Sequence, residues 1–167
     1  MTETPPNPRP RTTATDLKAY CRRIGYAGEH RATLDVLRNL LLCHTGTIAF
    51  ENLNPLMGWP VLLDAISLQQ KMVRDGRGGY CFEHNLLLRH MLEALGFQVR
   101  GLAARVLWNA PDGAVPPRNH MLLQVDLEGC SYLVDAGFGG VTLTGPLRLE
   151  PDIEQPTPHE TFRVLKV

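Results

Sequence analysis

Cys81 lies in the stretch "RGGYCFEHN" (residues 77–85), after a glycine pair and at the start of an apolar pattern with helical period. A cysteine is a strong nucleophile only as the thiolate, and the unpaired amides and dipole at a helix N-terminus favour that negative form. The glycines let backbone amides approach a reacting carbonyl group, so the Cys81 amide can donate to an oxyanion. The stretch predicts a nucleophilic cysteine, provided that the chain supplies a base.

A histidine and a carboxylate converge on a hairpin that we predict over residues 120–140. Apolar residues alternate along this segment, and Glu128-Gly129 separates its two halves. With a two-residue turn there, His120 and Asp135 are diagonal neighbours on one face, about 7–8 Å apart between backbones. A four-residue loop keeps this relation, whereas a three-residue loop puts the two residues on opposite faces.

Cys81, His120 and Asp135 match the roles of a nucleophile, its base and the carboxylate that orients the base. Each also has a plain alternative, namely a buried structural thiol, a strand-end histidine bonded to the backbone, and an aspartate that caps a turn. His84, one helical turn after Cys81, is a second candidate base, although no carboxylate accompanies it to orient its ring. The remaining histidines are expected at a helix surface or core edge (His90) or as ordinary surface residues (His30, His44 and His159).

Hydrophobic periodicity and turn residues predict the helices and strands that carry these three residues. Helices come first and strands follow, which is typical of an α+β fold. Helices are predicted over residues 15–26, 33–46, 67–74 and 81–96, the third opened by a capping box at "SLQQ". Residues 47–60 are predicted to be an irregular connection and residues 141–160 a proline-broken one. Strands are predicted within residues 97–109, in the hairpin, and from residue 161. The expected organisation is a disordered N-terminus (1–13), a helical bundle carrying the nucleophile (14–96) and an antiparallel β unit (97–167).

Composition narrows the class of partner and the compartment. The 17 basic residues balance the 17 acidic ones without a basic stripe, which disfavours nucleic-acid and anionic-membrane partners. We find neither a signal peptide nor an apolar run near the roughly 20 residues that span a bilayer, so a cytoplasmic protein is expected. The four cysteines show no C-x-x-C pairing, which fits a reducing compartment and disfavours a zinc site, so no metal is expected.

Four motifs, "HTGTIAFENLNPL", "RGGYCFEHN", "RNHMLLQV" and "LVDAGFGG", resemble arylamine N-acetyltransferases in order and spacing. The resemblance implies a helical bundle followed by an antiparallel β-barrel, in an architecture like that of papain-like cysteine proteases and transglutaminases. It implies xenobiotic metabolism, with transfer of an acetyl group from acetyl-coenzyme A as co-substrate to an arylamine, arylhydroxylamine or hydrazine. It places the catalytic triad at Cys81, His120 and Asp135, the pocket at Phe50, Val106, Phe138 and Gly139, and a structural ion pair at Arg77 and Glu83.

The resemblance also implies that the barrel is incomplete, because family members continue into an α/β lid-like region that has no counterpart in this chain. We therefore expect an open, wet cleft in which the acetyl-cysteine is lost to water, so that the chain mainly hydrolyses acetyl-coenzyme A. Self-association through the apolar surface left uncovered is expected as well. The alternatives are a catalytically weak or inactive binding fragment, and a transglutaminase-like or cysteine-protease-like enzyme.

Overall fold

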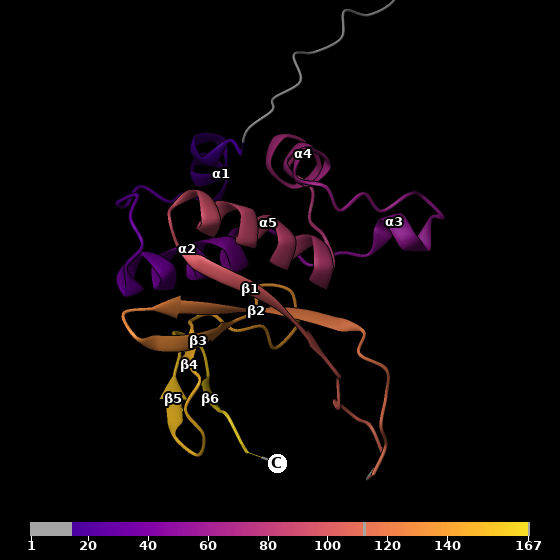
Figure 1. Cartoon of the computed structure of the whole chain (residues 1–167). Coiled ribbons are helices and arrows are strands. Elements are labelled where there is room, and N and C mark those ends of the chain that lie inside the picture. Colours follow the sequence, from indigo (N-terminus) through magenta and orange to yellow (C-terminus); the bar gives the residue numbers. More distant parts are fainter. Residues whose placement is uncertain (1–14, 112, 167) are drawn as a thin grey trace, which may run out of the picture.

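The computed structural model describes residues 15–111 and 113–166, and its elements have the α+β order that the sequence predicts. Helices come first and lie on one side of an antiparallel sheet formed by the later strands (Figure 1). The helical elements are α1 (Leu17–Ile24), α2 (Leu34–Thr47), α3 (Leu53–Leu56), α4 (Ala65–Leu68), the π-helical η1 (Gln69–Arg74) and α5 (Cys81–Ala94). The strands are β1 (Gln98–Ala104), β2 (His120–Leu127), β3 (Cys130–Val134), β4 (Leu147–Arg148), β5 (Glu154–Pro156) and β6 (Thr161–Arg163). The predicted disordered segment, residues 1–13, lies outside the described residues.

The ends of the first two helices are set by residues that the sequence shows. Asp16 accepts a hydrogen bond from the Ala19 amide at 2.9 Å, and Gly25 ends α1 in the left-handed conformation with a φ of 69°. Thr33 precedes α2, and its hydroxyl accepts from the Val36 amide at 3.4 Å. Both predicted helices are confirmed, since a polar cap starts each of them and glycine stops the first.

The third predicted helix starts earlier than the sequence pattern indicates. Its cap is Asp64, whose carboxylate accepts from the Ser67 amide at 3.0 Å, so Ser67 lies inside the helix and not at its cap. Aspartate caps a helix as well as serine does, and here it comes first along the chain. The helix then continues as η1, which ends at Arg74 as predicted.

The connection over residues 47–60 is more ordered than predicted, because it contains α3 and a strand-like contact. Phe50 pairs with Gly79 in an isolated parallel bridge. The Glu51 amide donates to the Gly79 carbonyl at 2.8 Å, and the Gly79 amide donates to the Ala49 carbonyl at 3.2 Å. This bridge ties the segment before α3 to the glycine pair before α5.

Strands β2 and β3 form the predicted hairpin in the predicted register. Leu123 pairs with Val134 and Leu127 pairs with Cys130, so Glu128-Gly129 alone makes the turn. Both turn residues have a positive φ, 51° and 76°, as a two-residue turn of type I′ requires. The register argued from a two-residue turn is therefore confirmed.

The described strands do not close into the barrel that was expected over residues 97–167. Strands β1 to β4 form an open antiparallel sheet in the order β1-β2-β3-β4, and β5 and β6 form a separate two-stranded sheet. The predicted connection over residues 141–160 carries β4 and β5, which are only two and three residues long. A strand as short as β4 offers too little backbone to join the sheet to the opposite edge at β1.

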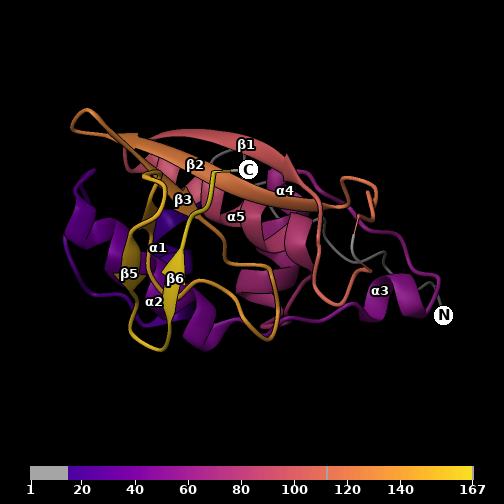
Figure 2. The same cartoon turned by 90° about the horizontal axis from the view of Figure 1, so that it is seen from below.

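A hydrophobic core joins the helices to the sheet, and α5 lies against β1 and β2 inside it. Figure 2 shows the helices behind the strands when the molecule is seen from below. The core includes four fully buried side chains of α5 and two of β2: Leu87, Leu88, Met91, Leu92, Leu123 and Val125. Burial of a leucine or methionine side chain contributes about 1.5–3 kcal/mol. The core therefore fixes α5, and with it the residue at its N-terminus.

Candidate active site

Cys81 is the first residue of α5, as the sequence predicts, and its side chain is partly exposed. The entry to the helix is held by Glu83, whose carboxylate accepts from the Tyr80 amide at 3.1 Å. The first amides of a helix have no acceptor within the helix itself. The thiol therefore belongs to the first turn of α5, whose backbone amides have no acceptor within the helix. This is the position that the sequence predicts for Cys81, after the glycine pair.

A chain of ion pairs holds the segment in front of Cys81. Glu83, only 1% exposed, pairs with Lys71 at 2.7 Å, Lys71 lies 3.7 Å from Glu51, and Glu51 pairs with Arg77 at 2.7 Å. The expected direct pair between Arg77 and Glu83 is wrong, because each of them has another partner. Burial raises the pKa of Glu51, but the amide at the start of α3 and the two cations outweigh burial and lower the pKa.

The hairpin brings His120 and Asp135 into direct contact. The His120 Nε2 atom lies 2.6 Å from the Asp135 Oδ2 atom, and both residues are buried. Burial lowers the pKa of His120, but the hydrogen bonds and charges of Asp135 and Cys81 outweigh burial and raise the pKa to about 9. At neutral pH the ring is thus an imidazolium held by a carboxylate. Because Nε2 is occupied, Nδ1 is the nitrogen that is left for the thiol.

Asn85 is a residue of the site that sequence reasoning missed. It is fully buried, and its amide group donates to Asp135 Oδ1 at 3.0 Å and to the Met121 carbonyl at 2.7 Å, while its oxygen accepts from the Ala136 amide at 3.0 Å. Asn85 lies four residues after Cys81, so both side chains leave the same face of α5. That spacing is the signal that points to it.

A cavity of about 250 Å³ lies beside the Cys81 thiol. Its lining includes three of the four predicted pocket residues, Phe50, Val106 and Phe138, together with His120. Gly139 is not part of this lining but lies next to Phe50, since a Cβ atom built on it would lie 3.7 Å from the Phe50 ring. Phe138 packs edge-on against the His120 ring, with centroids 5.3 Å apart, so the wall also supports the imidazole.

The same lining contains three residues that sequence reasoning did not select: Trp108, Asn119 and Gly137. Trp108 is 67% exposed. The strand predicted within residues 97–109 ends at Ala104, so Trp108 lies in the loop after β1. Trp108 and Phe138 also line a neighbouring cavity of about 560 Å³, which is mostly apolar and reaches Asp135. Aromatic side chains thus surround the approach to the thiol.

His84, the alternative base, has other partners. Its Nδ1 atom lies 2.9 Å from the His44 Nε2 atom, and its Nε2 atom lies 3.2 Å from the Ala49 carbonyl oxygen. Neither nitrogen remains for the thiol, so the geometry favours His120. The expectation that His44 lies on the surface is wrong, because His44 is fully buried on the face of α2 that meets α5.

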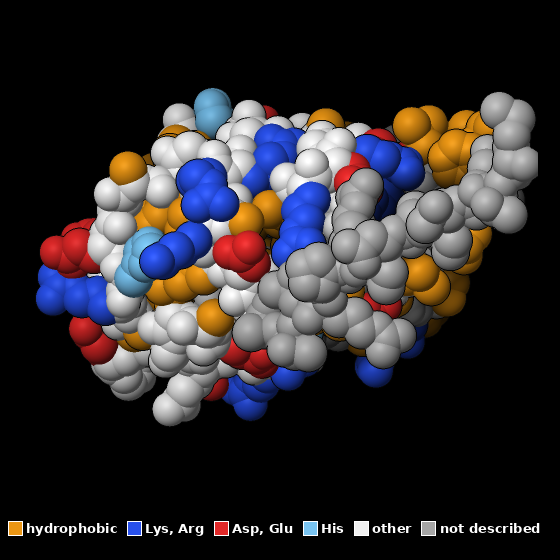
Figure 3. Space-filling model, turned by 90° about the horizontal axis from the view of Figure 1, so that it is seen from above, with side chains coloured by type: hydrophobic (Ala, Val, Ile, Leu, Met, Phe, Trp, Pro, Cys, Tyr) orange, Lys and Arg blue, Asp and Glu red, His pale blue; other side chains and the backbone are white. Residues whose placement is uncertain are grey.

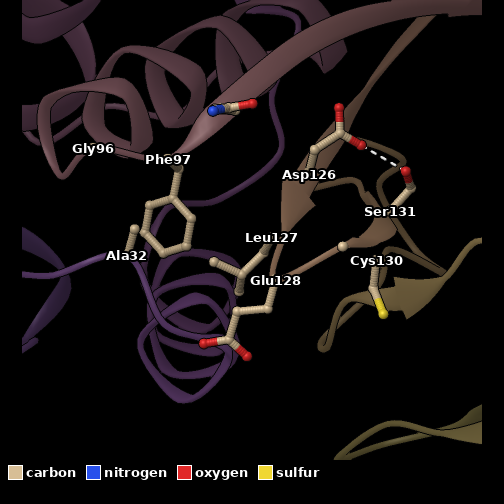
Figure 4. Close-up of a pocket in the computed structure, with 10 residues that line it drawn as sticks. Ala32, Gly96, Phe97, Asp126, Leu127, Glu128, Cys130 and Ser131 are labelled. Carbon is tan, nitrogen blue, oxygen red and sulfur yellow. Dashed lines mark hydrogen bonds between the residues drawn. The ribbon is translucent and has the colours of Figure 1, made fainter.

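A further cavity of about 500 Å³ lies at the opposite end of β2, beside the hairpin turn (Figure 4). Its walls come from the segment that leads from α5 into β1 and from both sides of the turn, and Asp126 accepts there from the Ser131 hydroxyl at 2.6 Å. This lining contains none of the residues predicted for the site. The chemistry is therefore concentrated at the Cys81 end of the sheet.

A family model described as "N-acetyltransferase" matches residues 33–167. An arylamine N-acetyltransferase of Mycobacterium tuberculosis is 53% identical over 155 residues, which cover 90% of this chain and 55% of that relative. The solved structure of arylamine N-acetyltransferase from M. tuberculosis superposes with a TM-score of 0.88 at 52% identity, covering 91% of this chain and 58% of that one. The structure of the Mycobacterium marinum enzyme in complex with CoA superposes with a TM-score of 0.85 at 53% identity, covering 89% and 56%.

The chain belongs to the arylamine N-acetyltransferase family. It spans about 55% of the length of the M. tuberculosis relative. The matched part contains both the α5 segment and the hairpin.

Proposed function

We propose that this chain transfers an acetyl group from acetyl-coenzyme A to an arylamine, arylhydroxylamine or hydrazine. Cys81 is the nucleophile, His120 the base and acid, and Asp135 the orienting carboxylate. The observation that carries the proposal is the buried 2.6 Å hydrogen bond between His120 and Asp135 next to a thiol at a helix N-terminus. The names of the relatives support an arylamine acceptor, and the complex of one of them with CoA supports the donor.

In the first half-reaction the Cys81 thiolate attacks the thioester carbonyl, and the Cys81 amide donates to the resulting oxyanion. The His120 imidazolium gives a proton to the departing coenzyme A sulfur, and an acetyl-cysteine remains. The raised pKa of His120 suits this step, because the ring holds the proton at neutral pH. Asp135 stabilises the imidazolium and keeps Nδ1 directed at the sulfur.

In the second half-reaction the neutral amine nitrogen attacks the acetyl-cysteine carbonyl, while His120 removes a proton from that nitrogen. The tetrahedral intermediate then collapses to the acetylated product and the Cys81 thiolate. Phe50, Val106 and Phe138 hold the aromatic ring of the acceptor, and Gly139 lies next to Phe50. Two successive displacements give ping-pong kinetics.

We also propose that water competes with the amine for the acetyl-cysteine. Two of the aromatic residues that line the cavity are strongly exposed, Phe50 by 48% and Trp108 by 67%. An acyl group in such an open cavity is accessible to water, and a closed site normally prevents this side reaction. Slow hydrolysis of acetyl-coenzyme A without an acceptor is the expected result.

The test is intact-mass spectrometry after brief mixing with acetyl-coenzyme A. One acetyl group is expected on the wild-type chain and on Cys130→Ala, a matched control because Cys130 is also a partly exposed thiol. None is expected on Cys81→Ala. The decay of the adduct with and without an arylamine separates transfer from hydrolysis. A wild-type chain that takes up no acetyl group refutes the proposal and favours an inactive binding fragment.

The architecture proposed from the resemblance is that of papain-like cysteine proteases and transglutaminases, with a helical part (residues 14–96) and a β part (residues 97–167). The support is the order of the site residues, since the cysteine starts a helix, the histidine starts β2 and the aspartate directly follows β3. The core that α5 and β2 share supports close packing of the two parts.

We propose that the chain acts in the cytoplasm on small molecules. Its four cysteines are all free, which fits a reducing compartment. Within residues 15–111 and 113–166, no helix has the length and apolar character needed to cross a bilayer.

We propose further that copies of the chain associate through exposed apolar side chains. Hydrophobic side chains gather most densely at the right-hand end of the face in Figure 3, the end where Figure 1 places α3. The segment around α3 exposes Leu53, Leu56, Met57, Trp59 and Leu62. Exposed apolar clusters of this kind favour association. Sedimentation velocity over a range of concentrations tests this, and a monomer throughout, unchanged by Leu56→Lys, contradicts it.

A further inference from the structure

Three polar rings form a buried row beneath the nucleophile. The Tyr20 hydroxyl lies 2.8 Å from His44 Nδ1, and His44 Nε2 lies 2.9 Å from His84 Nδ1. The row ends at the Ala49 carbonyl, 3.2 Å from His84 Nε2. Tyr20, His44 and His84 are at most 1% exposed. The acetyl-transfer steps above use none of these rings.

The hydrogen bonds of this row run in one direction. A carbonyl only accepts, so His84 Nε2 carries a proton and donates it to Ala49, and His84 Nδ1 of the neutral ring must accept. His44 Nε2 therefore donates to His84, and His44 Nδ1 accepts from the Tyr20 hydroxyl. Every polar atom of the three rings is used, and this holds the His84 ring in a single orientation.

The His84 ring supports a residue of the candidate acceptor cavity. Phe50 is 48% exposed, so burial alone does not fix its ring. The rings of Phe50 and His84 are parallel within 3°, with centroids 6.3 Å apart, the range of offset aromatic stacking. The same His84 ring bonds the carbonyl of Ala49, the residue before Phe50, which also accepts from the Gly79 amide. Both the backbone and the ring of Phe50 thus depend on His84.

We propose that His84 is a positioning residue for the aromatic acceptor, whose ring, held by His44 and the Ala49 carbonyl, fixes Phe50 in the wall of the cavity beside Cys81. This inference rests on the proposed function. The inference predicts different effects on two classes of acceptor. An aromatic amine contacts the Phe50 wall, whereas hydrazine has no ring and does not need that wall.

The experiment compares the wild type with His84→Leu and His84→Gln, and uses His90→Gln as the control on the same helix. For His84→Leu, the KM for p-toluidine is expected to rise about tenfold, the effect of losing an aromatic contact together with its backbone anchor. The KM for hydrazine and the rate of Cys81 acetylation are expected to change by less than about threefold. His84→Gln should lie between, because its amide can accept from His44 and donate to Ala49 but has no aromatic face. His90→Gln should match the wild type.

Binding of p-toluidine to the unacetylated chain, measured by saturation-transfer NMR, gives a readout that needs no turnover. If the wild type forms no acetyl-cysteine, the proposed function fails, and the comparison of Kd between wild type and variants still decides the role of His84. Equal KM and Kd values for p-toluidine in all four proteins overturn the inference. The inference is also overturned if a His84 variant slows Cys81 acetylation and raises the KM values for p-toluidine and hydrazine by the same factor. In that case His84 acts on the thiol. Should His84→Leu not fold, His84→Gln carries the same comparison.

Discussion

Gly137 lies directly against the backbone of Cys81. A Cβ atom built on Gly137 would come within 2.7 Å of the Cys81 Cα atom and 2.9 Å of its carbonyl oxygen. The residues after β3 therefore meet the start of α5 at a separation that only glycine permits. This contact places the thiol next to the histidine–aspartate pair, since Gly137 is two residues from Asp135 and bonded to it through a 2.9 Å hydrogen bond.

Gly137→Ala is expected to separate the two segments. The added methyl group meets backbone, which cannot rotate away, so the free energy of unfolding should fall by about 1–3 kcal/mol, the usual cost of overpacking. Cys81 acetylation should slow by about 10²-fold, because a displacement near 1 Å has this effect on reacting groups. Gly140→Ala is the control, since nothing lies within 4 Å of its added Cβ. Urea unfolding and intact-mass kinetics measure both effects, and equal values for the two variants would contradict the steric argument.

Asp135→Asn is expected to keep the fold and to remove most of the activity. An amide can occupy the site of the carboxylate, but it neither stabilises the imidazolium nor fixes the same tautomer, so acetylation of Cys81 should slow by about 10³–10⁴-fold. Asp126→Asn, on the same hairpin but at its far end, should remain within about twofold of the wild type. Rapid mixing with acetyl-coenzyme A, quenching and intact-mass spectrometry give the acetylation rates of both variants. A fully active Asp135→Asn would exclude the triad.

Asn85→Ala is expected to destabilise the chain. The change leaves the Ala136 amide and the Met121 carbonyl buried without this partner, and each loss costs about 1–3 kcal/mol. A decrease of about 3 kcal/mol in the free energy of unfolding should appear in urea. Asn39→Ala, at an exposed position of α2, is the matched control and should change little. If both variants unfold at the same urea concentration, the buried hydrogen bonds of Asn85 do not contribute measurably to stability.

Stability should be highest near pH 6.5 and fall on both sides. Burial lowers the pKa of His44 far below its usual range, and burial likewise lowers the pKa of His84, so as the pH falls below about 6.5 the unfolded chain binds these two protons before the folded chain does. The free energy of unfolding should then fall by up to about 2.7 kcal/mol per pH unit as the pH decreases. The pKa of His120 is raised to about 9, so its contribution is lost as the pH rises from 6.5 to 9.

Urea unfolding at pH 5.5, 6.5 and 9 checks this profile. His84→Gln should remove about half of the acid-side slope, because one of the two buried histidines is gone. An acid-side slope that is the same in His84→Gln and the wild type would show that other groups cause it.

The parts of the molecule that were predicted correctly depend on local rules. Glu128-Gly129 satisfies the two-residue turn, and the turn fixes the register that brings His120 and Asp135 together. The start of α5 at Cys81 follows from the glycine pair and the apolar period after it. These features need only neighbouring residues, so a single sequence contains the information.

The features that were missed depend on contacts across the fold. The burial of His44 follows from its partners Tyr20 and His84, which are 24 and 40 residues away along the chain. Lys71 reaches Glu83 because η1 passes α5, and no local pattern signals that approach. The open sheet, in place of a barrel, likewise depends on how later strands pair, which periodicity does not specify.

The candidate site is assembled from two layers, with the thiol on α5 and the imidazole–carboxylate pair on one hairpin. A transient separation of these layers lengthens the distance between sulfur and imidazole but leaves the hydrogen bond within the hairpin intact. The rate at which an alkylating agent modifies Cys81 thus reports how closely the helices pack against the sheet. It responds to local opening that leaves the helix and strand content, and therefore the spectroscopic signal, unchanged. A ligand or partner that holds the helices against the sheet is then expected to increase the reactivity of Cys81 without contacting the reacting atoms.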